Sequence, residues 1–187
     1  DAIMTRLTSD LANDLGNLAH RTLSMIERYA GGTIPHAPPL DQLDVIGGMR
    51  ALGDAAVGNP GAGAEGLARR MEHTIEQLDF SGTLTAIMDL VTKANQFIES
   101  TAPWKLAKDS DNAQQLARVL ATLAEVLRIV AIALEPFMPR VSAALWGQLG
   151  LEGTPRRFAE MSQWAVLPTG RPIGRRQILF PRAESPS

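Results

Sequence analysis

The sequence predicts an all-α fold, a bundle of about five main helices with an irregular C-terminal tail packed across it. Apolar residues recur every three to four positions through most of residues 1–149, the period of helices that bury one face. Clusters of glycine and proline interrupt this period. Strand-like runs occur at 164–167 and 177–180, and we expect them to form a small hairpin. A length of 187 residues suits one domain, with the bundle at 1–149 and the tail at 150–187.

Residues 1–29 form the predicted first helix, whose two faces differ sharply. At about 100° per residue, one arc is apolar and holds Leu7, Leu11, Leu15, Leu18, Thr22, Met25 and Ile26. The opposite arc is polar and holds Asp10, Asn13, Asn17, Arg21, Ser24 and Arg28. Amide, guanidinium and hydroxyl groups of this kind read base edges and phosphates. The helical period begins without a capping cluster, so we expect the chain to be part of something longer.

Turn signals delimit the helices that follow. Gly31-Gly32 ends the first helix. Further helices are predicted over about 41–57, 65–78, 82–100, 111–135 and 140–149, the last with Trp146 facing inward. The run Phe80-Ser81-Gly82 predicts the break before the helix at 82–100. A short helix restarts at Pro103, since the first turn tolerates proline. The helix at 111–135 is apolar on most sides, which predicts a central, buried position.

Composition argues against several classes of protein. The formal net charge of −2 gives no general attraction to polyanions, so any nucleic-acid site must be local. Residues 150–187 carry 6 Lys and Arg against 3 Asp and Glu, so the basic surplus lies in the tail. The absence of cysteine suits a reducing compartment. We find no signal segment and no run apolar enough to span a membrane, and expect a soluble, cytoplasmic protein.

Catalytic motifs are missing from the sequence. It contains no glycine-rich phosphate loop, no His-Glu-x-x-His and no Gly-x-Ser-x-Gly. The histidines, His20, His36 and His73, are scattered without metal-ligand spacing. Acidic pairs such as Glu72 and Glu76 fit solvated helix faces. We therefore expect no metal site, no catalytic residue and no enzymatic activity in the isolated chain.

Four motifs carry a resemblance to a known family. They are Asn13-Asp14-Leu15-Gly16-Asn17-Leu18 with Arg21, Pro103-Trp104-Lys105-Leu106-Ala107-Lys108 after Ala94-Asn95-Gln96-Phe97-Ile98-Glu99, Pro136-Phe137-Met138-Pro139, and Leu179-Phe180-Pro181-Arg182. Together they resemble the C-terminal anticodon-binding domain of bacterial-type methionyl-tRNA synthetases, class I enzymes. The second and third motifs resemble those of the leucine, isoleucine and valine enzymes as well, whereas the first and last point to methionine.

The resemblance implies a fragment that binds tRNA. In the family a separate N-terminal catalytic domain uses ATP and methionine and carries a zinc-bearing insertion, and its signatures are absent here. The implied partners are the initiator and elongator methionine tRNAs and that catalytic domain in the same chain. No sign of an appended dimerisation domain is present, so we expect a monomer.

The family's anticodon-contacting residues match Asn17, Arg21 and Trp104 in this sequence. The resemblance implies a CAU anticodon whose first base stacks near Trp104, at a site where two helix starts face one groove. Single-stranded loops are read by stacking bases on aromatic rings and hydrogen-bonding their edges. By analogy, Asn13, Arg28 and Pro103 are further candidate contacts.

Other interpretations of these residues stay open at this point. A tryptophan in a helical bundle is most often core, and we place Trp146 and Trp164 in that class. Arg21 could pair with Asp14, Glu27 or an acid on another helix. Arg175 and Arg176 could bind a tRNA stem or contact the missing catalytic domain. The alternative functions are a helical protein-interaction module and an enzyme within the bundle, for which no convergent carboxylates or histidines can be assembled.

Overall fold

The computed structural model describes residues 2–37, 64–153, 158–161, 163–164, 166–180, and it is all-α over these ranges. The predicted fold class is confirmed. The main helices are α1 (Ala2–Ala30), α4 (Ala64–Glu76), α5 (Phe80–Thr101), α7 (Ala113–Leu134) and α8 (Pro139–Gln148). Short elements are α6 (Pro103–Leu106), η1 (Ser110–Asn112) and α9 (Phe158–Met161). The helix predicted at 41–57 lies outside the described residues.

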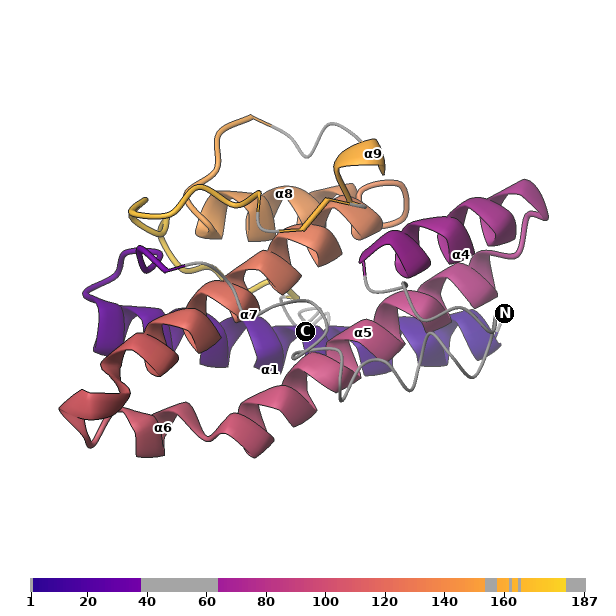
Figure 1. The fold of residues 1–187 in the computed structure, drawn as a ribbon. Helices are drawn as coiled ribbons and strands as arrows, with labels where there is room; N and C mark the ends of the chain where they lie inside the picture. Colours follow the sequence, from indigo (N-terminus) through magenta and orange to yellow (C-terminus); the bar gives the residue numbers. More distant parts are fainter. Residues whose placement is uncertain (1, 38–63, 154–157, 162, 165, 181–187) are drawn as a thin grey trace, which may run out of the picture.

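Helix α7 is the centre of the bundle, as the apolar residues on most of its sides predicted. Every residue from 119 to 134 is buried, and α7 packs against α1, α5, α6, α8 and α9 (Figure 1). Helix α1 also packs along α5, and α5 along α4. On α1, Leu11, Leu15 and Leu18 are fully buried and belong to the same hydrophobic core as the residues of α7. No helix in the described part of the chain is long and apolar enough to cross a membrane.

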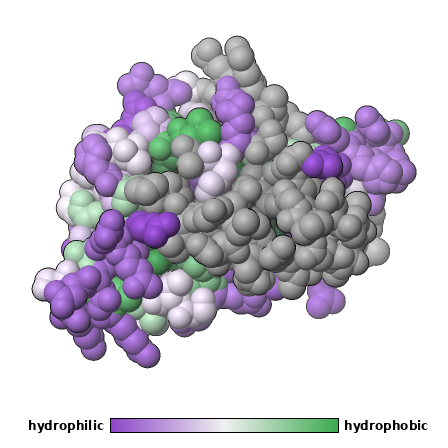
Figure 2. Space-filling view, viewed as in Figure 1, coloured by the Kyte–Doolittle hydropathy of each residue, from purple (hydrophilic) through white to green (hydrophobic). Residues whose placement is uncertain are grey.

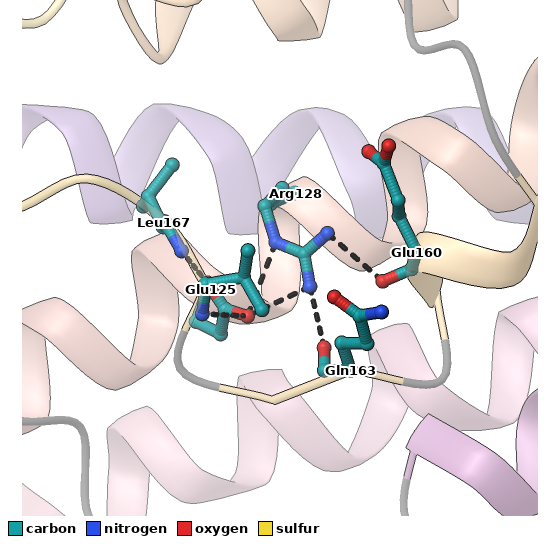
Figure 3. A network of polar contacts seen from close by, with 6 residues as sticks. Glu125, Arg128, Glu160, Gln163 and Leu167 are labelled. Carbon is teal, nitrogen blue, oxygen red and sulfur yellow. Dashed lines mark hydrogen bonds and ion pairs between the residues drawn. The ribbon is translucent and has the colours of Figure 1, made fainter.

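A buried ion pair on α7 holds the start of the tail (Figure 3). Arg128 donates from Nε and Nη2 to Glu125 Oε1, at 3.1 and 2.8 Å, and also to the carbonyl oxygens of Glu160 and Gln163, at 3.2 and 2.6 Å. The two oxygens of Glu125 accept hydrogen bonds from the backbone N–H groups of Val166 and Leu167. Because both charges are satisfied on several sides, they can remain in the core.

The break between α4 and α5 differs from the prediction. Phe80, Ser81 and Gly82 do not form the break between two helices, because they form the first turn of α5. The helix is capped by the carboxylate of Asp79, which accepts a hydrogen bond of 2.8 Å from the N–H of Gly82. A Cβ at Gly82 would collide with that carboxylate. The turn itself is made at Leu78, whose φ of 56° lies in the left-handed region.

Replacing the cap residue tests this assignment. Asp79→Ala removes the acceptor of the Gly82 N–H and is expected to lower the free energy of unfolding by about 1 kcal/mol. Urea unfolding followed by circular dichroism measures the loss. Gln77→Ala, at an exposed position in the same turn, is the matched control. Equal stability of the two variants would contradict the capping role.

The predicted hairpin in the tail is wrong for the residues that the structure describes. Neither run forms a strand there, and an isolated bridge joins Thr33 to Pro172 instead. N–H groups that the hairpin needs are used elsewhere, since those of Val166 and Leu167 donate to the carboxylate of Glu125. The tail therefore packs on the bundle in an irregular conformation, while the domain boundary drawn at residue 150 stays a prediction.

Candidate nucleic-acid interface

Helix α1 presents the polar arc that its sequence predicted. Asn13, Asn17 and Arg28 are exposed, and Arg21 and Ser24 are half-buried, whereas Leu11, Leu15 and Leu18 of the opposite arc are fully buried. Burial of one arc against α5 and α7 fixes the rotation of α1 about its axis. The amide and guanidinium groups are thereby held on a rigid element at the surface.

Helix α5 supplies a partner to each of two residues on this arc. Asn95 lies beside Asn17, with 3.5 Å between the Asn17 Nδ2 and Asn95 Oδ1 atoms, and donates at 3.1 Å to the carbonyl of Asp14. One turn further along α5, Glu99 accepts a 2.6 Å hydrogen bond from Arg21 Nη2. The acid that pairs with Arg21 is thus on another helix. Glu99 keeps 63% of its side chain exposed, so this ion pair borders solvent.

Trp104 enters the site from the turn between α5 and α6. Ala102 ends α5 with φ 43° and starts α6, and Pro103 takes the first position of α6. Trp104 is half-buried against the core, and the Arg21 guanidinium carbon lies 5.8 Å from the centre of its ring. The structure therefore brings Asn17, Arg21 and Trp104 into one cluster, although Trp104 is 83 residues from Arg21 in sequence.

One expectation about the site needs correction. Asn17 and Arg21 lie in the middle of α1 and not at a helix start, because the helix extends from Ala2 to Ala30. Of the three residues, Trp104 alone stands at the beginning of a helix. Pro103, a further candidate contact, is buried at the first position of α6, next to Trp104.

Sequence reasoning gave no role to Asn95 and Glu99. The signal that could have found them is their spacing of four residues, which matches the spacing of Asn17 and Arg21. Two helices packed side by side can pair such positions turn by turn. Which faces meet could not be read from either helix alone.

The other tryptophans are covered by protein, whereas the histidines are not. Trp146 is buried and donates to the carbonyl of Glu152 at 3.2 Å, and Trp164 is half-buried against the core. The three histidines are exposed. Within the described residues no group of three or more His, Asp or Glu side chains could hold a metal ion. Figure 2 shows hydrophilic side chains gathered at the lower left, over the end of the bundle that holds α6.

Comparison with known proteins decides the family. Residues 64–168 match the family described as the anticodon-binding domain of tRNA ligase. The chain belongs to this family. The chain is 36% identical, over 98% of its length, to the methionine–tRNA ligase of Caldanaerobacter subterraneus. It is 37% identical, over 96% of its length, to that of Streptomyces coelicolor.

Solved structures agree with this family. The anticodon-binding domain superposes on Mycobacterium tuberculosis methionyl-tRNA synthetase in its apo form with a TM-score of 0.78 at 27% identity, covering 97% of this chain. The resemblance to methionyl-type domains is confirmed. The chain spans 27% and 32% of the two ligases and 34% of the solved synthetase, so it corresponds to one part of such proteins.

Proposed function

We propose that this domain recognises the CAU anticodon of methionine tRNAs. The observation that carries the proposal is the convergence of Asn17, Arg21 and Trp104 from two distant stretches of the chain. These residues combine a ring for stacking, a planar cation and an amide, which are the groups used to read unstacked bases. The methionyl identity of the relatives supports CAU as the sequence read.

Each residue has a distinct part in the proposal. The exposed side of the Trp104 ring stacks the first base of the anticodon, worth about 1 to 3 kcal/mol. Asn17 offers a donor and an acceptor to a base edge. Arg21 offers a planar fork to a base carbonyl or a phosphate, and Glu99 and the Trp104 ring hold that fork in place. Asn13 and Arg28, both exposed, flank this group and contact the RNA backbone.

The wider function is proposed from the relatives. The chain acts as the tRNA-binding part of a methionine–tRNA ligase, and it serves the initiator and elongator methionine tRNAs. A catalytic domain in the same polypeptide binds ATP and methionine, with zinc in its insertion. We infer a monomeric, cytoplasmic protein whose isolated anticodon-binding part does not aminoacylate tRNA.

Fluorescence quenching tests the proposal. Two RNA stem-loops, one with CAU and one with its first base changed, are titrated into the wild-type chain and into Trp104→Phe. We expect stronger quenching by CAU, and little quenching in the variant, whose Trp146 and Trp164 lie outside the site. Equal responses to both RNAs, or none, would contradict anticodon reading and favour the protein-interaction module.

A second prediction concerns Arg21. Arg21→Ala is expected to weaken binding of the CAU stem-loop by about 1 kcal/mol, roughly fivefold, because it removes one charged hydrogen-bonding group at a half-exposed position. Affinity is measured by anisotropy at low and high salt. If the affinity lost in the variant becomes smaller as salt is raised, the partner of Arg21 is a phosphate. If the lost affinity stays constant, the partner is a base edge. Arg6→Ala, at the far end of α1, is the control, and an equal loss there would contradict the role of Arg21.

A further inference from the structure

Residues 170–180 run antiparallel along α1, a course that no sequence motif indicated. Near the end of α1 the N–H of Ile34 donates to the carbonyl of Arg171 at 2.8 Å. Further along, Arg176 donates to Ser24 Oγ at 2.5 Å and pairs with Glu27 at 3.0 Å. At the far end the Phe180 ring faces Gly16, with its Cδ2 atom 4.0 Å from where a Cβ would stand. The tail thus follows α1 for about 16 Å between Glu27 and Gly16, at 1.5 Å per residue.

The polar arc of α1 therefore has a wall on each side. At about 100° per residue, Gly16 and Glu27 lie beyond one edge of the arc and meet the tail, and Arg176 reaches from there to Ser24, which lies near the middle of the arc. Asp14 and Arg21 lie toward the other edge, where they meet α5. The exposed residues of the arc stand between the two walls.

The tail wall is positively charged. Residues 170–180 contain Arg171, Arg175 and Arg176 and no acidic residue, in a chain whose net charge is −2. Arg175 is exposed, whereas Arg171 pairs with Glu152 at 3.6 Å and Arg176 pairs with Glu27 while keeping 38% of its side chain exposed. Arg28, exposed on the last turn of α1, adds a further cation to the same region. Such a concentration of guanidinium groups matches a polyanion.

Besides the contacts of Arg176, the wall is held in place by contacts that do not involve the arginine side chains. The N–H of Gly174 donates to the carbonyl of Gln148 at 3.0 Å, and the backbones are so close that a Cβ on Gly174 would collide with the carbonyl of Gly147. Leu179 is buried in the core. Arg175 and Arg176 are therefore presented on a fixed segment, which lowers the entropy lost when a ligand binds.

We propose that residues 170–180 form the second wall of the tRNA groove and that Arg175 and Arg176 bind phosphates of the anticodon arm. The inference rests on the proposed function, because it takes the RNA that stacks on Trp104 to continue along α1. Ser24 and Glu27, which hold Arg176, lie three and six residues beyond Arg21, about 5 to 9 Å along the helix axis. Phosphate contacts position the strand, whereas base contacts near Trp104 select it.

A salt series distinguishes this role from that of the base-reading cluster. The CAU stem-loop and its first-base variant are titrated against the 187-residue chain, Arg175→Gln, Arg176→Gln and the double variant, from about 50 to about 200 mM salt. We expect both RNAs to be weakened by the same factor. From about 50 to about 200 mM salt, the ratio of wild-type to variant affinity is expected to fall roughly threefold for each phosphate contact that the variant has lost. The reason is that binding of the variant releases fewer counterions.

Control variants make each outcome decisive. Arg140→Gln removes an exposed arginine at the start of α8 and is expected to leave affinity and salt slope unchanged. Arg176→Lys, which keeps the charge, should retain the salt slope of the wild type. If the tail variants bind like wild type while CAU preference persists, the second wall is wrong and the proposed function stands. If the wild type shows no CAU preference, the proposed function fails and the inference fails with it.

Discussion

Replacing Trp104 with alanine is expected to weaken binding of a CAU stem-loop by about 1 to 3 kcal/mol, roughly 5- to 150-fold. The variant removes the stacking surface and also the ring over which Arg21 lies, at 5.8 Å. Anisotropy titration at constant salt measures the change. Because stacking is the proposed basis of recognition, this loss should be the largest that a single residue of the site can cause.

The fold must survive for that result to be interpreted. Trp104 is half-buried against the core, so its removal also costs some packing. Leu106→Ala provides a matched control, since Leu106 is half-buried on the same short helix and packs on the same core. Circular dichroism and thermal unfolding should show comparable stability for the two variants. A Trp104→Ala protein that binds RNA no more weakly than Leu106→Ala would refute stacking at Trp104.

Replacing Glu125 with alanine is expected to lower the free energy of unfolding by about 3 to 5 kcal/mol. Arg128, only 3% exposed, would be left as a buried charge without its counterion. The N–H groups of Val166 and Leu167 would also lose their acceptor. Denaturant unfolding measures the loss, and Glu135→Ala, at the exposed end of the same helix, is the control.

A second variant separates the charge from the packing in this network. Glu125→Gln keeps the shape and an acceptor oxygen but removes the negative charge, so its loss should be smaller than that of the alanine variant. Replacing both Glu125 and Arg128 with methionine should cost less than the sum of the two single changes, since neither charge is then stranded. A Glu125→Ala loss below about 1 kcal/mol would mean that solvent reaches the pair and would contradict its burial.

The two faces of α1 and the buried position of α7 were predictable from the sequence. Both follow from the spacing of apolar residues, which is a local property of the chain. The start of α6 was predictable for the same reason, because proline at a first helical position acts through its own backbone. The start of α5 was not, because Phe80-Ser81-Gly82 has turn-like composition and yet Asp79 caps a helix there.

The candidate site residues were likewise predictable from the sequence only in part. Asn17, Arg21 and Trp104 could be proposed from motifs, but their meeting depends on how α1 packs on α5. Glu99 was not anticipated as the partner of Arg21, which is 78 residues away. Arg176 lies 152 residues from Ser24, and its hydrogen bond depends on the path of the whole tail.

By itself, the sequence determined the all-α class, the amphipathic first helix and the motifs that indicated an anticodon-binding family. Periodicity specifies which face of a helix is buried, since that depends on residues within a few turns. Only the tertiary structure decided that α5 pairs with α1 at Asn95 and Glu99 and that the tail returns along α1 and not as a hairpin. The physical reason is that such contacts join residues far apart in the chain. Their partners are chosen by the packing of the core and by competition for backbone hydrogen bonds, as at Leu167 and Glu125.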